Sequence, residues 1–437
     1  MVTRRRTTAL GAVLLIFVTA ACSGGGGGHA TGAGSKPKVT PPATMTASPT
    51  DGSKSVAPDA PVQLTAAGGT ITRVTMQGAG KSLSGTYSTS GTTWIAKKGL
   101  KPDTDYTVTA TARNSAGQTT TTTTHFHTLA ARRTLRISDI TPNSGETVGV
   151  GMPIIVDFNH DVTNKAAVEK ALQVYSGQPR AGAWLWASDS EAVFRTHSYW
   201  PANQPVKLVA DLTGVHAGSG LWGSTDTTRA FRIGDSHIVS VNLHSDKAKF
   251  YFNGKLKRTV PVSGGTGGTD SHGNNFYTTG GIHLTMGSFD SVWMTSPNIK
   301  PGEPGYYHEI VYDDVRISNS GEFMHRNPGD PGCLGNSNCS HGCVRMTPSG
   351  AAWWRATAYR GDPVTVTGTP RTLEWDNGWG YWQKSWSSWL SDSKNGAVTT
   401  IALQPSSPSP TPSSPSPSAP STSSSPSVSP SVSPSSP

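Results

Sequence analysis

The sequence has little charge, few cysteines and no long apolar stretch. Charged residues make up 14% of its 437 residues, and no dense run of Lys or Arg follows residues 4–6, so the formal net charge of +9 does not indicate a nucleic-acid partner. The four cysteines lack the closely spaced pairs of a structural zinc site. Long helical patterns are scarce, whereas Gly and Pro number 49 and 32. These features exclude an α-helical protein and favour a mainly β chain of several domains.

The most apolar run occupies residues 9–18, directly after three arginines at residues 4–6. A run of about 7–15 apolar residues behind a basic start is typical of a secretory signal and is too short to span a bilayer. Thr-Ala-Ala-Cys at residues 19–22 resembles a bacterial lipobox. We therefore expect a signal peptide over residues 1–21 and a lipid on Cys22 that anchors the exported chain to the outer face of the membrane. The alternative is an ordinary signal peptide with a chance cysteine.

Both ends of the mature chain are of low complexity. Residues 22–57 are mainly Gly, Ser, Thr, Pro and Ala, and residues 404–437 are almost only Ser and Pro. Neither segment has enough apolar side chains to form a core. The first is predicted to be a disordered tether and the second a disordered, extended tail.

Two segments between these ends have the alternation of β-sandwiches. Over residues 58–129, short β-rich runs are separated by turn residues, and Leu100 and Tyr106 occupy the positions of the corner in an immunoglobulin-like domain. A second, diverged copy is expected over residues 134–234. The sequence thus predicts two immunoglobulin-like β-sandwiches.

A third β-rich domain is expected over residues 237–368. Asn253-Gly254 between two strand-like runs is the strongest two-residue hairpin signal in the chain. Thr347 before Pro348 predicts a short helix, because threonine caps a helix N-terminus and proline is tolerated in the first turn. The Gly- and Pro-rich residues 297–304 predict a mobile flap.

A Trp-rich extension follows over residues 369–403. It contains five regularly recurring tryptophans, at 375, 379, 382, 386 and 389. Aromatic side chains of this density either pack on a neighbouring domain or form a patch that binds glycans.

The motif Cys339-Ser340-His341-Gly342-Cys343 carries the chemistry, together with His325, which precedes Ser340 by a gap of fourteen residues. A thiol must lose its proton to attack a carbonyl, and imidazole is the side chain best suited to take it at neutral pH. A thiolate and imidazolium pair is one possible resting state. His341 lies two residues before Cys343, where a side chain on a tight turn usually points away, so we favour His325 as the base and expect His341 to stabilise the turn.

Gly342 gives a substrate carbonyl room to approach, and the backbone N–H groups of Gly342 and Cys343 are natural oxyanion donors. Cys343 taken alone is more simply explained as a buried, inert cysteine. The histidine, the motif and the export signal together make covalent acyl transfer the better interpretation.

This combination resembles the L,D-transpeptidases, whose catalytic domain is of the YkuD type. Their signature is a histidine, a gap of this length, then Ser or Thr followed by His-Gly-Cys. The resemblance covers residues 237–368 and implies that Cys343 is the nucleophile and His325 the base. Actinobacterial members with two immunoglobulin-like domains and a lipid anchor share the whole layout. In such proteins the C-terminal extension packs on the catalytic domain.

The same resemblance assigns substrate-binding positions. Tyr307 matches a tyrosine of the flap over the acyl site, and Met286 matches an apolar residue under that flap. Ser320-Gly321 matches a pair whose backbone lines the donor pocket, and Ser340 is grouped with these positions. Arg345 departs from relatives that have Asn there, and we expect it to hold a carboxylate of the stem peptide. Arg326, after the base, replaces a frequent Ser, which matters little if only its carbonyl orients His325.

Cys333 and Cys339 remain once Cys22 and Cys343 are assigned. Outside the cytoplasm two such thiols form a disulfide, and the prolines and glycines between Asn327 and Cys333 supply the turns. The competing interpretation is a zinc site built from the three C-terminal cysteines and His325 or His341. The disulfide is preferred, and neither a metal nor another cofactor is expected.

The resemblance implies attack of the thiol on a tetrapeptide stem of peptidoglycan, release of D-Ala, and acyl transfer to an amine of a neighbouring stem, which gives 3→3 cross-links. Carbapenems are the expected inhibitors, and the protein is expected to be a monomer in the cell-wall zone, where anionic polymers suit its positive charge. The alternatives are an L,D-carboxypeptidase, a sortase-like transpeptidase that attaches proteins to the wall, and a catalytically silent wall-binding lipoprotein.

Overall fold

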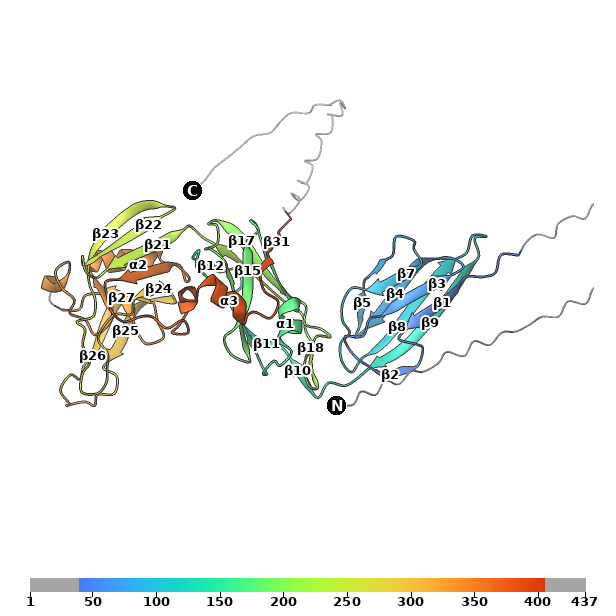
Figure 1. Ribbon diagram of the computed structural model, residues 1–437, viewed down its shortest axis with the longest axis horizontal. Coiled ribbons are helices and arrows are strands. Elements are labelled where there is room, and N and C mark those ends of the chain that lie inside the picture. Colours follow the sequence, from blue (N-terminus) through green and yellow to red (C-terminus); the bar gives the residue numbers. More distant parts are fainter. Residues whose placement is uncertain (1–38, 330, 405–437) are drawn as a thin grey trace, which may run out of the picture. The chain divides into compact units, whose positions relative to one another are not determined.

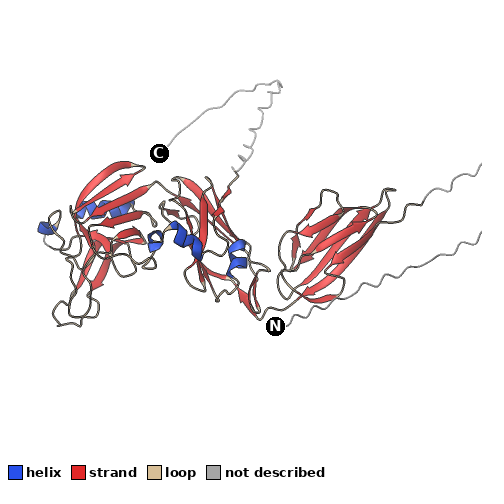
Figure 2. Cartoon of the chain, in the orientation of Figure 1, coloured by secondary structure: helices blue, strands red, loops and turns tan. Residues whose placement is uncertain are grey.

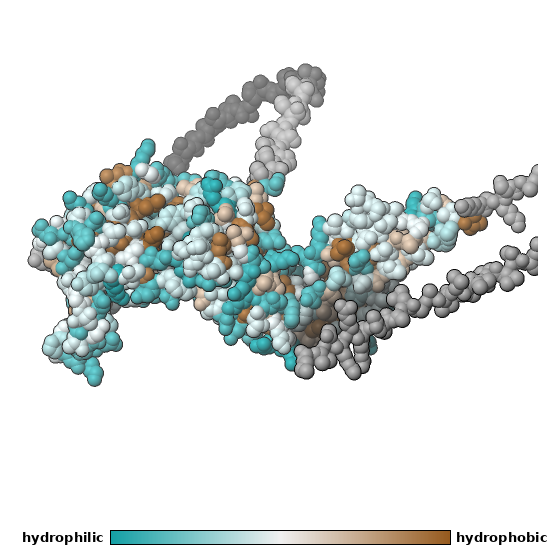
Figure 3. Space-filling view, viewed as in Figure 1, coloured by the Kyte–Doolittle hydropathy of each residue, from teal (hydrophilic) through white to brown (hydrophobic). Residues whose placement is uncertain are grey.

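The computed structural model describes residues 39–329 and 331–404, and strands dominate it (Figures 1 and 2). The predicted signal peptide, Cys22, residues 22–38 of the predicted tether and the Ser/Pro tail from residue 405 lie outside the described residues. Within them, no helix is long and apolar enough to cross a membrane. On the face shown in Figure 3, hydrophobic residues form only small, scattered patches. The mainly β prediction is confirmed.

The first immunoglobulin-like sandwich has two sheets, ordered β1-β3-β7-β6 and β2-β9-β8-β4-β5. The strands are β1 Thr44–Ser48, β2 Ser53–Val56, β3 Gln63–Ala67, β4 Thr70–Gly78, β5 Lys81–Leu83, β6 Gly85–Tyr87, β7 Thr93–Ala96, β8 Asp105–Arg113 and β9 Thr119–Thr128. The expected corner is present, because the Tyr106 hydroxyl accepts a hydrogen bond from the backbone N–H of Lys101 at 2.7 Å.

The predicted tether extended too far. β1 pairs with β3 and β2 pairs with β9, so residues 44–56 belong to the first sandwich. Met45 and Ala47, at alternate positions of β1, pack against its core. These two apolar residues at alternate positions of β1 suffice because pairing with the neighbouring strand β3 supplies the backbone hydrogen bonds.

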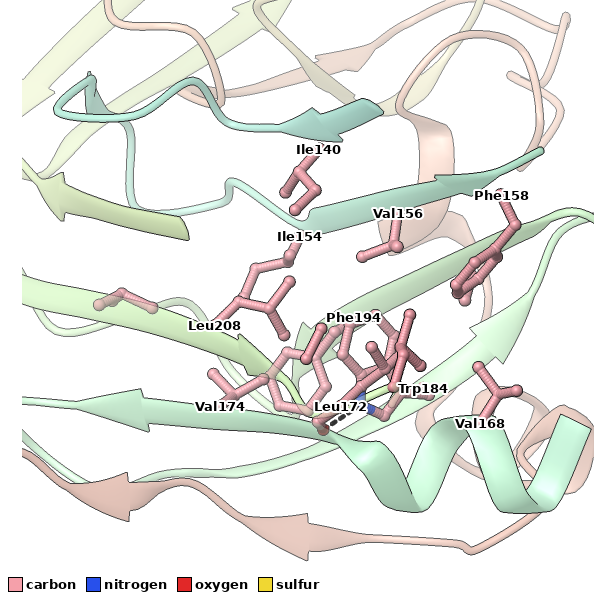
Figure 4. Close-up of a cluster of buried hydrophobic side chains, with 14 of the residues drawn as sticks. Ile140, Ile154, Val156, Phe158, Val168, Leu172, Val174, Trp184, Phe194 and Leu208 are labelled. Carbon is pink, nitrogen blue, oxygen red and sulfur yellow. Dashed lines mark hydrogen bonds between the residues drawn. The ribbon is translucent and has the colours of Figure 1, made fainter. Parts of the chain in front are cut away.

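The second sandwich has five-stranded sheets ordered β11-β13-β16-β15-β30 and β12-β20-β17-β14-β31, with a small sheet β10-β19-β18 and helix α1 Lys165–Ala171. Its own strands are β10 Arg133–Leu135, β11 Ile137–Thr141, β12 Thr147–Val148, β13 Ile154–Phe158, β14 Leu172–Ser176, β15 Ala181–Trp186, β16 Glu191–Thr196, β17 Gln204–Ala210, β18 His216–Gly218, β19 Leu221–Gly223 and β20 Thr227–Ile233. Figure 4 shows the side chains of this core, where the indole of Trp184 donates to the carbonyl of Leu172.

The third domain is built on a nine-stranded sheet ordered β24-β29-β21-β22-β23-β28-β27-β26-β25. Its elements are β21 His237–Asn242, β22 Lys247–Phe252, β23 Lys255–Ser263, β24 Gly281–Leu284, β25 Gly287–Thr295, β26 His308–Arg316, β27 Phe323–Arg326, the 3-10 turn η1 Pro331–Cys333, β28 Val344–Met346, α2 Pro348–Thr357 and β29 Pro363–Thr367. Asn253 and Gly254 both have positive φ and form the expected hairpin turn. The hydroxyl of Thr347 caps α2 by accepting from Gly350 N–H at 3.2 Å.

The Trp-rich extension forms η2 Gly380–Gln383, α3 Trp386–Asp392, β30 Val398–Thr399 and β31 Ile401–Ala402. β30 pairs with β15 and β31 pairs with β14. Trp389 is fully buried against Ala183 and Leu185. The extension therefore completes the second sandwich, and the expectation that it packs on the catalytic domain is wrong for its C-terminal half.

Candidate active site

Cys343 ends a tight turn that leads into β28. Gly342 has a φ of 133°, a backbone conformation that residues with side chains rarely adopt. The Ser340 hydroxyl donates to the carbonyl of Cys343 at 2.6 Å and accepts from Gly342 N–H at 3.1 Å. Because Ser340 is buried and both of these hydrogen bonds occupy its hydroxyl, it holds the turn. The expectation that it contacts substrate is therefore wrong. Gly342 N–H is likewise engaged, which leaves Cys343 N–H as the oxyanion donor to consider.

A disulfide links Cys333 and Cys339, with their Cα atoms 6.3 Å apart. Cys339 is fixed further, because its backbone N–H donates to the Ser263 hydroxyl at 3.1 Å. The two bonded cysteines are unable to ligate zinc, and the described residues contain no group of three or more potential metal ligands. The bridge stiffens the chain between β27 and the turn.

His325 lies on β27, which runs parallel to β28, with His325 opposite Arg345. It is 2% exposed, and its Nδ1 lies 2.7 Å from the carbonyl oxygen of Arg326. A carbonyl only accepts, so Nδ1 carries the proton and Nε2 keeps a lone pair. The Arg326 side chain points elsewhere and binds Asp313 at 2.9 Å, so its carbonyl alone orients the imidazole.

The resting thiol and imidazole both favour their neutral forms. Burial raises the pKa of Cys343 to about 12, although the backbone N–H of Phe323 opposes this. Burial also lowers the pKa of His325 to about 4, and the positive charge of Arg345 adds to that effect. A resting thiolate and imidazolium pair is therefore disfavoured, and proton transfer must accompany the attack on substrate.

A cleft of about 470 Å³ opens over Cys343. The tip of the β25–β26 hairpin corresponds to the expected flap, and this hairpin extends from the rest of the domain in Figure 1. Tyr307, from the hairpin, lines the cleft together with Ser320 and Gly321, three of the residues that the family resemblance assigned to substrate binding. His341 lines it too, with its ring 4.8 Å from Tyr307 and 4.9 Å from Phe276. His341 thus forms part of an aromatic wall.

Besides Ser340, two further expected substrate-binding residues do not line the cleft. Met286 lies at the base of the hairpin, and its sulfur is close to Gly378 of the Trp-rich extension. Arg345 turns toward the disulfide loop, where its guanidinium donates to the Cys339 carbonyl at 3.3 Å. Met286 precedes β25, and Arg345 lies opposite His325 in the pairing of β28 with β27.

A buried acid in the cleft was not among the site residues predicted from the sequence. Glu322 lines the cleft, and its carboxylate accepts from Thr279 N–H at 2.7 Å and from the Thr279 hydroxyl. The hydroxyl proton of Thr279 is thereby used, so His283 Nε2, 2.8 Å from that hydroxyl, is the donor. Burial opposes ionisation of Glu322, but His283 and Thr279 hold its pKa below the usual value. Glu322 directly follows Ser320-Gly321 in the sequence, and this position was the signal that could have identified it as a site residue.

Asp314 is a second missed acid. It is fully buried on β26, and neither of its side-chain oxygens has a hydrogen-bond partner among the described residues. Burial and the neighbouring Asp313 raise its pKa to about 7. Its charge also disfavours the thiolate of Cys343. Two consecutive acids inside an apolar strand were the sequence signal for an unusual site.

Comparison with known proteins identifies the family. Residues 236–366 match the family model described as L,D-transpeptidase catalytic domain, and residues 53–216 match a bacterial Ig domain model that spans parts of both sandwiches. The chain is 33% identical to L,D-transpeptidase 5 of Mycobacterium tuberculosis over 362 residues, which cover 81% of this chain and 78% of that protein. The chain belongs to the L,D-transpeptidase family. It is therefore a cysteine-dependent transpeptidase.

A second relative agrees with this assignment. L,D-transpeptidase 2 of M. tuberculosis is 32% identical over 349 residues, which cover 79% of this chain and 83% of that protein. A solved structure of the L,D-transpeptidase LdtMt1 in complex with imipenem matches 53% of this chain and 98% of its own, with 27% identity and a TM-score of 0.45.

Proposed function

We propose that this L,D-transpeptidase forms 3→3 cross-links between peptidoglycan stems through a thioester on Cys343. The observation that carries the proposal is the position of Cys343 on a glycine turn at the cleft, directly before β28, together with a buried His325 on the paired strand β27 whose Nε2 keeps a free lone pair. Family membership supports the reaction class, and an exported location follows from a wall substrate.

In the first half-reaction the Cys343 sulfur attacks the amide carbonyl between the third residue and D-Ala of a tetrapeptide. His325 Nε2 takes the thiol proton as the carbon–sulfur bond forms, which avoids a free thiolate in a site that disfavours it. The carbon–nitrogen bond then breaks. His325 returns its proton to the leaving D-Ala amine, and the acyl group remains as a thioester.

In the second half-reaction an amine of a neighbouring stem attacks the thioester. Neutral His325 takes a proton from this amine, the carbon–sulfur bond breaks, and the proton passes to the Cys343 sulfur. No net oxidation or reduction occurs. Cys343 N–H is the donor we assign to the developing oxyanion.

The aromatic wall made by Tyr307, His341 and Phe276 shields the thioester. Excluding water favours the amine as acceptor over hydrolysis, which would make the enzyme a carboxypeptidase. Ser320 and Gly321 line the same cleft and are proposed to contact the donor peptide.

We also propose a lipid on Cys22, with the two sandwiches as a spacer between membrane and active site. An anchor of two or more acyl chains is sufficient for stable attachment, since one chain alone is marginal. β-Lactams of the carbapenem class are the proposed inhibitors, because their strained amide offers the thiol an acyl donor.

The test is incubation of purified protein with a disaccharide-tetrapeptide, followed by mass spectrometry of products. We expect release of D-Ala and formation of a dimer whose fragments place the link between two third residues. Cys343→Ala is the matched inactive control. If free tripeptide forms without dimer, the enzyme is a carboxypeptidase and not a transpeptidase. If no D-Ala is released, the proposal is refuted.

A further inference from the structure

The cleft over Cys343 contains a cation outside the segment that matches the catalytic-domain model. Arg371 lines this cleft, although the match ends at residue 366. Its backbone is firmly tied to the sheet edge, because Arg371 accepts from Gly280 N–H at 2.7 Å, and Gly280 in turn accepts from Leu373 N–H at 2.8 Å. The Arg371 Cα is therefore held in place by the main chain, independently of its side chain.

The guanidinium of Arg371 has spare hydrogen-bonding capacity. Its contacts are long, 3.4 Å from one terminal nitrogen to each of the carbonyl oxygens of Asn275 and Tyr277. An arginine has five N–H donors in a planar fork. Among the described residues no carboxylate forms an ion pair with it, and its side chain is partly exposed to the cleft.

The acidic residue of the cleft does not compete for this guanidinium. Glu322 is 5% exposed, and both of its oxygens are bound to Thr279, with His283 3.8 Å away. Among the described lining residues, Arg371 is the one with a permanent positive charge. Arg345, the cation that the sequence suggested for this task, faces the Cys339 carbonyl.

We propose that Arg371 forms a carboxylate-binding subsite that selects anionic acyl donors. This inference rests on the proposed function, since a tetrapeptide stem has a carboxylate at its C-terminal D-Ala and a second one on its diamino acid. A guanidinium binds a carboxylate through two parallel charge-assisted hydrogen bonds, and a partly enclosed cleft strengthens them. The subsite places the donor amide relative to the thiol, so its effect falls on donor binding.

The experiment compares D-Ala release, or release of its amide, by wild type and Arg371→Gln with three donors. One donor is the free tetrapeptide, one is amidated at the C-terminal carboxylate, and one is amidated at the diamino-acid carboxylate. Arg371→Gln keeps a side-chain N–H donor but removes the charge. We expect it to raise KM for the free tetrapeptide about 10- to 100-fold with kcat changed far less. Arg371→Lys should recover part of this loss.

The amidated donors locate the contact. The amidated donor that lacks the recognised carboxylate should have the same KM with wild type and with Arg371→Gln. The amidated donor that keeps this carboxylate should still have a higher KM with Arg371→Gln than with wild type. Arg258→Gln removes a charge outside the cleft lining and serves as the matched control, and Arg345→Gln tests the competing cation. If Arg371→Gln loses activity equally with all three donors, Arg371 has only a structural role. If it loses no activity with any donor, the subsite is excluded.

Alkylation of Cys343 by uncharged iodoacetamide provides a readout independent of donors. Its rate should be similar in wild type and Arg371→Gln if the thiol environment is intact, and a large change would contradict a pure binding role. Wild-type protein that releases nothing from any donor would overturn the proposed function itself. Active wild type with an indifferent Arg371→Gln would overturn only the subsite.

Discussion

The hydroxyl of Ser340 donates a hydrogen bond to the carbonyl of Cys343 at 2.6 Å, from a position that is 1% exposed. The same oxygen accepts from Gly342 N–H. One buried side chain therefore closes the turn that presents the nucleophile, and the serine of the motif has a structural role.

Ser340→Ala should lower the free energy of unfolding by about 1–3 kcal/mol, because it leaves a buried N–H and a buried carbonyl without this partner. It should also reduce kcat, since the turn is freer to misplace the thiol. Chemical denaturation and D-Ala release measure the two effects. Ser288→Ala on exposed β25 is the control, and a Ser340→Ala protein equal to it in both assays would contradict this account of the turn.

His325→Ala should reduce acylation far more than His341→Ala, by about 100-fold or more, because only His325 is assigned the proton. His341 contributes to the aromatic wall, so its loss should raise hydrolysis relative to cross-linking.

The acid limb of the pH–rate profile should lie well below pH 6.5, since burial lowers the pKa of His325 to about 4 and the base stays neutral down to that region. A limb at 6.5 would contradict the lowered pKa of His325, and a reversed order of the two variants would make His341 the base.

Asp314→Asn should increase stability at high pH. The pKa of Asp314 is raised to about 7 in the folded protein, against 3.8 as its ordinary value, so the native state favours the protonated acid. The associated stability is fully present below about pH 3.8 and is lost as pH rises through 7. As pH rises from about 3.8 to 7, the free energy of unfolding of the variant should therefore increase relative to that of wild type, by up to about 4 kcal/mol at pH 8.

Thermal unfolding from pH 4 to pH 8 measures this difference, with exposed Asp376→Asn as the control. A gap between Asp314→Asn and wild type that does not change with pH would show that Asp314 is satisfied in solution by a partner such as water.

Trp389→Ala should destabilise the second sandwich by about 3–5 kcal/mol, the usual cost of truncating a buried aromatic side chain. Trp389 is fully buried, its indole donates to the Ala183 carbonyl at 3.0 Å, and the guanidinium of Arg195 stacks 4.7 Å from its ring. Trp293→Ala, at a site 61% exposed, should cost much less. Equal effects in denaturant unfolding would mean that the extension does not complete this domain.

The elements that the sequence predicted well depend on local signals. The Asn253-Gly254 hairpin, the helix cap at Thr347 and the corner at Tyr106 each need only a few adjacent residues. The disulfide between Cys333 and Cys339 is also local, since its cysteines are six residues apart. The motif around Cys343 was visible for the same reason.

The elements that it missed depend on strand register and long-range packing. Arg345 and Arg371 are equally basic in sequence, but in the fold Arg345 donates to the Cys339 carbonyl, whereas Arg371, held by its carbonyl to Gly280 N–H, lines the cleft. The partners of Glu322 come from residues about forty positions earlier, on Thr279 and His283. The docking of Trp389 on β15 spans 206 residues, beyond any local pattern.

The central claim is that Cys343 forms the acyl-enzyme, and intact-protein mass spectrometry after exposure to a carbapenem tests it most directly. We expect one adduct with the full mass of the carbapenem, because ring opening expels no leaving group, and peptide mapping should place it on Cys343. Cys343→Ala should remain unmodified while the Cys333–Cys339 bridge is intact in both proteins. An adduct on another residue, or an equal adduct on Cys343→Ala, would contradict the account.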